Sequence, residues 1–166
     1  MTTIMKDTPS MPPVSIVIPL RIESTEREAN LHCVLQYLLR SPFVYIDLLE
    51  ADKERHFFFT HHERIRYRFV HDEEPVFYRT HYLNELLREA QHSIVGIWDA
   101  DVLIPEAQLI AAVWHVLGGC VLCFPYNGKF RFLEKEAMSF GKTWMSCRPE
   151  KVIACWGDRR WEEPFW

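Results

Sequence analysis

Short apolar runs alternate with longer amphipathic stretches along this chain. Runs rich in β-branched or aromatic residues predict strands at 14–20, 43–52, 66–71, 93–98 and 120–126. Apolar residues recurring every three or four positions predict helices at 24–42, 79–92 and 105–118. This alternation predicts an α/β fold with an open, mostly parallel sheet and helices on both faces.

Local signals refine the expected helix ends. Thr25 and Glu28 have the spacing of a capping box, and Pro105 suits the first turn of its helix. The middle helix is expected to bury a stripe formed by Leu83, Leu86, Leu87 and Ala90.

Composition narrows the class of protein. The 166 residues are 48% hydrophobic with a net charge of −4, which suits a globular domain with one core. The basic residues of 63–69 alternate with apolar ones and predict the solvated face of a strand, so no basic face suggests a nucleic-acid partner. No run approaches the roughly 20 apolar residues of a membrane span, and 1–13 has no apolar signal-peptide core. We therefore expect a cytoplasmic protein.

Two clusters of potential metal ligands have simpler interpretations. Cys120 and Cys123 form a CxxC, but their apolar surroundings and the lack of a second pair at zinc spacing favour buried, reduced thiols over a metal or redox site. His61, His62 and Glu63 are adjacent, so their side chains diverge, and we expect a solvated loop.

Polar residues follow three of the expected strands. Arg21 follows the first, Glu50 and Asp52 end the second, and Asp99 and Asp101 follow the fourth. Because the carboxyl ends of parallel strands share one edge, these groups are expected to form one rim. Two adjacent carboxylates repel each other, and Mg²⁺ or Mn²⁺ held with phosphate oxygens would relieve that repulsion. The alternative is a solvated turn in which Asp caps a helix.

The sequence lacks the motifs of several other nucleotide- and phosphate-binding sites. No GxGxxG follows the first strand and the chain has no GxxxxGK[ST], which argues against dinucleotide binding and excludes a P-loop. The D-x-D follows a late strand, which disfavours phosphatases with an aspartate nucleophile and receiver domains.

The motifs VSIVIPLRIES, DLLEAD, FYRTHYLNELLREA, IVGIWDADVLIPEAQL and FPYNG occur in this order. Together they resemble the family 2 glycosyltransferases with the GT-A fold, most closely predicted bacterial members related to galactosyl- and chondroitin-type transferases. The polar, Pro-rich residues 1–13 are expected to form a flexible leader. The resemblance implies a nucleotide-sugar-binding core at 14–128 and the start of an acceptor-side region at 129–166.

The resemblance also implies roles for individual residues. Asp99 would face the ribose or the cation, and Asp101 would be the direct ligand of Mn²⁺ or Mg²⁺. Nucleotide contacts would come from Pro19, Arg21, Glu50, His71 or Asp72, Arg79, Asn84, Asp99 and Ala100. Glu50 would accept a hydrogen bond from the base. The implied reaction is inverting transfer from a nucleotide-diphosphate sugar, with UDP favoured, to a saccharide or other hydroxyl acceptor.

The C-terminal region departs from the family pattern. The family's general base lies in a late acidic segment that is not found here, which leaves Asp158, Glu162 and Glu163 as candidates. The aromatic tail favours a fragment, or self-association through Trp156, Trp161, Phe165 and Trp166. We therefore expect donor binding with little transfer by this chain alone.

Two other functions stay open. One is a non-catalytic nucleotide-sugar-binding or scaffold protein. The other is a sugar-nucleotide pyrophosphorylase, although its usual glycine-rich loop is missing from PLRIESTERE.

Overall fold

The computed structural model describes residues 11–126 and the backbone of 154–156. The elements in chain order are β1 (Val14–Leu20), α1 (Thr25–Leu38), β2 (Val44–Asp52), β3 (Ile65–His71), α2 (Arg79–Glu89), β4 (Ile94–Ile97), α3 (Glu106–Leu117), β5 (Leu122–Phe124) and β6 (Ala154–Trp156). The base candidates Asp158, Glu162 and Glu163 lie outside the described residues, as do residues 1–10 of the expected leader and most of 129–166.

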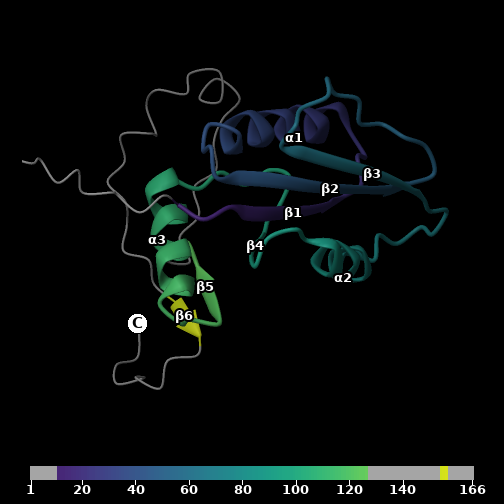
Figure 1. Cartoon of the computed structure of the whole chain (residues 1–166). Helices are drawn as coiled ribbons and strands as arrows, with labels where there is room; N and C mark the ends of the chain where they lie inside the picture. Colours follow the sequence, from purple (N-terminus) through teal and green to yellow (C-terminus); the bar gives the residue numbers. More distant parts are fainter. Residues whose placement is uncertain (1–10, 127–153, 157–166) are drawn as a thin grey trace, which may run out of the picture.

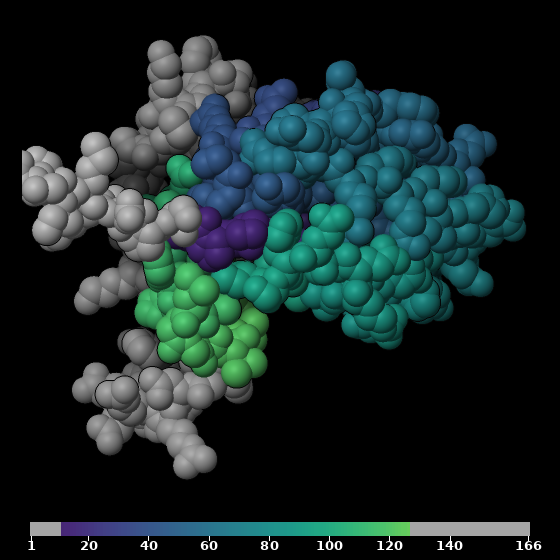
Figure 2. All heavy atoms as spheres, in the orientation of Figure 1, coloured from purple at the N-terminus to yellow at the C-terminus, as the bar shows by residue number. Residues whose placement is uncertain are grey.

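The first four strands form one parallel sheet in the order β3-β2-β1-β4 (Figure 1). This confirms the expected α/β class with a parallel sheet. β1 is central and all seven of its residues are buried, because it pairs with β2 on one edge and β4 on the other. In the space-filling view, the purple part of the chain that includes β1 shows only as a narrow patch between its neighbours (Figure 2).

Helices α1 and α2 cover opposite faces of this sheet, as expected (Figure 1). Leu31 and Leu35 of α1 pack with Ile16 and Ile18 of β1 in the larger core. Tyr82 and Leu86 of α2 pack with Val17, Leu49 and Ala51 in the smaller one. The chain moves from β1 to β2 in one direction and from β3 to β4 in the other, so right-handed crossovers place the two helices on opposite faces.

The connection between β2 and β3 contains no helix. It buries Phe57 completely in the larger core, on the face that α1 covers. Phe57 stacks on Phe59 with ring centroids 5.2 Å apart and also meets Tyr67 at 5.7 Å. This aromatic cluster fills the space over β3 that a crossover helix would otherwise occupy.

Several local expectations were wrong. Ser24, not Thr25, caps α1: its backbone is extended and its hydroxyl accepts from Arg27 N–H at 3.2 Å, so no Thr25–Glu28 capping box forms. Pro105 is the N-cap of α3, one residue before the first turn. α2 buries Tyr82 and Leu86, whereas Leu87 is 37% exposed, because the helix turns its Tyr82 side toward the sheet.

The fifth expected strand does not join the parallel sheet. β5 pairs antiparallel with β6 in a separate two-stranded sheet. Cys120 and Cys123 are half-buried rather than buried, and no disulfide joins the cysteines that the structure describes. In the described part of the chain, no helix is both long and apolar enough to cross a membrane.

We predict that Gly96 is required where β4 meets β1. An added Cβ would lie 2.6 Å from Cδ1 of Ile16, its fully buried partner in the strand register. Gly96→Ala should therefore lower the free energy of unfolding by about 1–3 kcal/mol through overpacking. Ile16→Val removes Cδ1, so the double variant should lose less stability than the sum of the single losses in urea unfolding. Additive losses would contradict this close packing.

Candidate functional site

A hollow of about 480 Å³ lies at the carboxyl end of β1 and beside the turn after β4. The chain adds β2 and β3 on one side of β1 and β4 on the other, so the carboxyl end of β1 is the topological switch point of the sheet. Open α/β sheets bind their ligands in the crevice at this point, and we call this hollow the switch-point hollow. Its lining consists of Pro19, Leu20, Arg21, Glu23, Arg27, Phe77, Arg79, Asp99, Ala100 and Asp101. The structure thus brings together six of the residues expected from sequence: Pro19, Arg21, Arg79, Asp99, Ala100 and Asp101.

The D-x-D lies on a turn held by Trp98. Trp98 is 5% exposed, and its Nε1 donates to the carbonyl of Val102 at 2.8 Å. This bond closes the turn on its inner side and leaves Asp99 and Asp101 exposed on its outer side. Arg79, at the start of α2, donates from Nη2 to Oδ1 of Asp99.

The donor set fits a divalent cation that is shared with a ligand. Asp99 and Asp101 offer hard carboxylate oxygens, and the Asp101 carboxylate has no hydrogen-bond or ion-pair partner among the described residues. Those residues also form no group of three or more His, Cys, Asp or Glu that could hold a metal alone. Mg²⁺ commonly binds through one or two carboxylates and completes its shell with phosphate oxygens and water.

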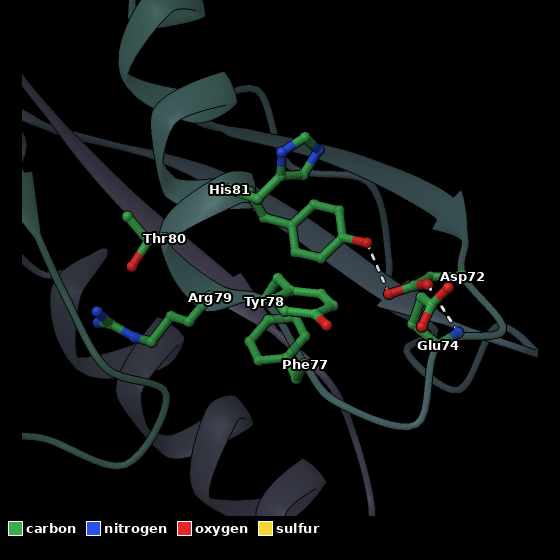
Figure 3. A pocket seen from close by; sticks show the side chains of 8 residues that line it. Asp72, Glu74, Phe77, Tyr78, Arg79, Thr80 and His81 are labelled. Atoms are coloured by element: carbon green, nitrogen blue, oxygen red, sulfur yellow. Dashed lines mark hydrogen bonds between the residues drawn. The ribbon is translucent and has the colours of Figure 1, made fainter.

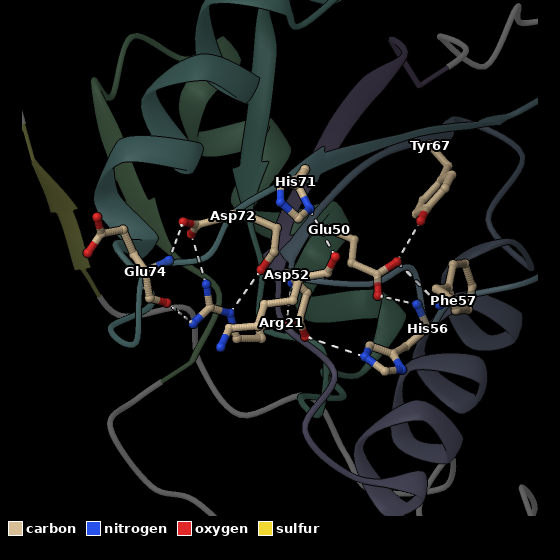
Figure 4. A network of polar contacts seen from close by, with 11 residues as sticks. Arg21, Glu50, Asp52, His56, Phe57, Tyr67, His71, Asp72 and Glu74 are labelled. Carbon is tan, nitrogen blue, oxygen red and sulfur yellow. Dashed lines mark hydrogen bonds and ion pairs between the residues drawn. The ribbon is translucent and has the colours of Figure 1, made fainter.

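The guanidinium of Arg21 is bonded to other parts of the rim and is not free to bind a ligand (Figure 4). Its Nε donates to the Ala51 carbonyl at 2.9 Å, and its Nη1 donates to the Glu74 carbonyl at 3.0 Å. Its Nη2 donates to Asp72 Oδ2 at 2.8 Å, and both side chains of this ion pair are at most 10% exposed. Arg21 therefore ties the end of β1 to β2 and to the segment after β3.

Asp72 receives two further hydrogen bonds in the same network. The Tyr82 hydroxyl donates to Oδ2 at 2.6 Å, and the Glu74 N–H donates to Oδ1 at 3.0 Å. These bonds hold the pKa of Asp72 below its usual value, the Tyr82 bond most strongly and with support from Arg21. Burial, followed by the bond to Asp72, raises the pKa of Tyr82 to about 12.

Glu50 is fully buried near the end of β2. Its Oε1 accepts from the His56 N–H at 2.9 Å, and its Oε2 accepts from the Phe57 N–H at 3.2 Å. Oε2 also accepts from the Tyr67 hydroxyl, and burial followed by this bond raises the pKa of Tyr67. Glu50 thus holds the β2–β3 connection, and its expected hydrogen bond to a nucleobase stays a prediction.

Two other expected contacts lie outside the switch-point hollow. His71 is exposed at the end of β3, where its Nδ1 lies 2.9 Å from the Lys53 carbonyl and its Nε2 lies 3.2 Å from Glu73. Asn84 is exposed in the middle of α2 and lines neither this hollow nor the adjoining one.

A second, more open hollow of about 670 Å³ adjoins the first and shares Phe77 and Arg79 with it. It is lined by Asp72, Glu74, Phe77, Tyr78, Arg79, Thr80, His81 and Tyr82. Figure 3 shows Arg79 extending away from Asp72 and Glu74, so its guanidinium lies at the opposite end of this group.

Sequence reasoning did not identify Glu23, Arg27 or Phe77. Arg27 lies in the first turn of α1 directly after β1, and this position was a usable signal for a residue at the switch point. The Arg21 Cζ lies 5.4 Å from the centroid of the Phe77 ring, a contact that no local sequence pattern indicates.

Comparisons of the chain with models of protein families, with curated proteins and with solved structures found no match.

We predict that Glu50→Gln destabilises the protein by about 1–3 kcal/mol. A glutamine amide would place an N–H₂ against groups that already donate to Glu50, leaving a buried donor unsatisfied. Urea unfolding measures the loss. The control is Glu54→Gln in the same connection, where the side chain is exposed. Equal stability of the two variants would contradict the assigned role of Glu50.

We also predict that Tyr82→Phe raises the pKa of Asp72 toward its usual value, because the variant removes the strongest of the bonds that lower it. NMR titration of the carboxyl carbons measures this change directly. Tyr78→Phe, in which the exposed ring of the same segment loses its hydroxyl, is the control.

Linkage between proton binding and folding determines how the Asp72 network changes the free energy of unfolding with pH. The folded-state pKa of Asp72 lies below its unfolded value of about 3.9, so its contribution is fully present above that pH. The contribution is lost as the pH falls through the folded-state pKa. Tyr82→Phe should therefore be less stable than wild type at pH 7, and the difference should narrow below about pH 4. An unchanged Asp72 pKa in Tyr82→Phe would refute this network.

Proposed function

We propose that this chain binds a nucleotide-diphosphate sugar together with Mg²⁺ or Mn²⁺ in the switch-point hollow. We further propose that it is a metal-dependent, inverting glycosyltransferase of the GT-A type that transfers the sugar to a hydroxyl acceptor, with UDP-sugars as donors. The observation that carries the proposal is the meeting of Asp99, Asp101 and Arg79 in one hollow at the carboxyl end of β1.

The charges of this hollow support a diphosphate ligand. Arg79 is 43% exposed, so its planar guanidinium is accessible to phosphate oxygens and can make two parallel hydrogen bonds to them. Arg27 lines the same hollow and is 49% exposed. The bound cation would add charge stabilisation of the departing nucleoside diphosphate. Arg79 would hold that diphosphate in place while the bond to the sugar breaks.

We assign the rest of the donor to the adjoining hollow. A nucleotide-diphosphate sugar has a ring system at each end of its diphosphate, and Arg79 and Phe77 stand between the two hollows. Tyr78 is 55% exposed there and offers a ring face, while Glu74 offers carboxylate oxygens to hydroxyl or N–H groups. We propose that one end of the donor lies against these residues.

Metal-dependent UDP binding tests this proposal, and Asp101→Asn is the sharpest variant. The substituted asparagine keeps the shape of the side chain but removes the negative charge that would ligate the cation. UDP affinity in the presence of Mn²⁺ should therefore fall about tenfold or more. Calorimetric titration with and without Mn²⁺ measures this change. Glu63→Gln, which neutralises an exposed acid of the β2–β3 connection, should bind UDP like wild type.

UDP affinity that is independent of Mn²⁺, or equal in wild type and Asp101→Asn, would reject the proposed site. Binding and catalysis are then separated with a panel of UDP-sugars and simple saccharide acceptors. Metal-dependent transfer with inversion, by this chain or by a longer chain that contains it, supports the transferase. Binding without turnover by either chain supports a non-catalytic nucleotide-sugar-binding protein.

A further inference from the structure

Three arginines and three acids line the switch-point hollow: Arg21, Arg27, Arg79, Glu23, Asp99 and Asp101. Arg27 binds Glu23, four residues earlier in the chain, at 2.9 Å, and Arg79 binds Asp99, whereas Arg21 binds Asp72, which is outside this lining. Arg79 weakens the attraction of the hollow for a free dication, because it repels the ion and occupies a carboxylate oxygen of Asp99 that would ligate it.

We infer that Arg79 exchanges partners in this hollow, pairing with Asp99 in the chain alone and passing to the diphosphate when cation and nucleotide bind together. This inference rests on the proposed function and adds to it that Arg79 makes cation binding depend on the nucleotide. A cation–diphosphate complex brings an anion for Arg79 and a cation for Asp99 at the same time, so neither charge is left without a partner.

The contacts of Arg79 make such an exchange inexpensive. Its side chain is 43% exposed and that of Asp99 is 57% exposed, and solvent-exposed ion pairs of this kind contribute little stability. Arg79 lines both hollows, so its long side chain can reach a ligand in either one without movement of α2. Arg21 cannot exchange partners in this way. Its guanidinium donates to Ala51, Asp72 and Glu74, and its side chain is only 10% exposed.

The exchange predicts opposite effects of one substitution on two ligands. Arg79→Gln frees Asp99, so affinity for Mn²⁺ alone should rise about two- to fivefold, the range expected for release of an exposed ion pair. The same variant lacks the guanidinium for the diphosphate, so UDP affinity in the presence of Mn²⁺ should fall about tenfold or more. In wild type, Mn²⁺ must raise the affinity for UDP by the same factor by which UDP raises the affinity for Mn²⁺. In Arg79→Gln this factor should be smaller.

The test measures free Mn²⁺ by electron paramagnetic resonance during titration of the full chain, with UDP titrations by calorimetry alongside. Arg88→Gln is the matched control, since it removes an equal charge from an exposed position of the same helix that lines neither hollow. We expect Arg88→Gln to leave the affinity for Mn²⁺ alone close to that of wild type. In an Asp99→Asn background, the gain from Arg79→Gln should disappear.

Equal gains in Mn²⁺ affinity from Arg79→Gln and Arg88→Gln, or no gain from either, would overturn the exchange. If wild type binds UDP in a Mn²⁺-dependent way in that experiment, the proposed function stands without it. If wild type binds no UDP at all, the proposed function and the exchange both fail.

Discussion

The complete burial of β1 is the constraint on which the rest of this structure depends. Every residue from Val14 to Leu20 is buried, and the one side-chain hydroxyl among them, on Ser15, is bonded to His92 at 2.9 Å. Such a strand is stable only with a neighbour on each edge and a helix on each face. The chain therefore goes from β1 to β2 over one face and returns to β4 over the other, and the crevice opens where these paths separate.

Burial then divides the charged residues of this rim into two groups with different roles. Glu50 and Asp72 are buried, and hydrogen bonds from the chain itself satisfy them, because a buried charge without partners would be costly. They fix the loops that follow β2 and β3. Asp99, Asp101 and Arg79 lie on the outside of the rim, where they can change partners at little cost. The fixed group holds the scaffold, and the exposed group is the one that we assign to the ligand.

Much of this arrangement could be predicted from the sequence, because it depends on short-range patterns. Alternating apolar runs predicted the four parallel strands and three helices, and the shared edge of parallel strands predicted that Asp99 and Asp101 meet Arg21. The partners of Glu50 could not be predicted, because they are backbone N–H groups placed by the burial of Phe57. The ion pair of Arg21 joins it to a residue 51 positions away. The exposure of Asn84 depends on the rotation of α2, whose apolar residues allow more than one buried stripe.

The central claim is that the carboxyl edge of the sheet at β1 and β4 is the ligand site. Backbone amide NMR of the isotope-labelled chain, titrated with UDP and diamagnetic Mg²⁺, tests it most directly because it reports on every resolved amide at once. The account predicts that the shifted amides cluster at 20–27, 77–82 and 99–101, and that the shifts require Mg²⁺. Shifts that instead cluster at the opposite edge, around 43–45 and 62–66, or spectra that UDP and Mg²⁺ leave unchanged, would contradict it.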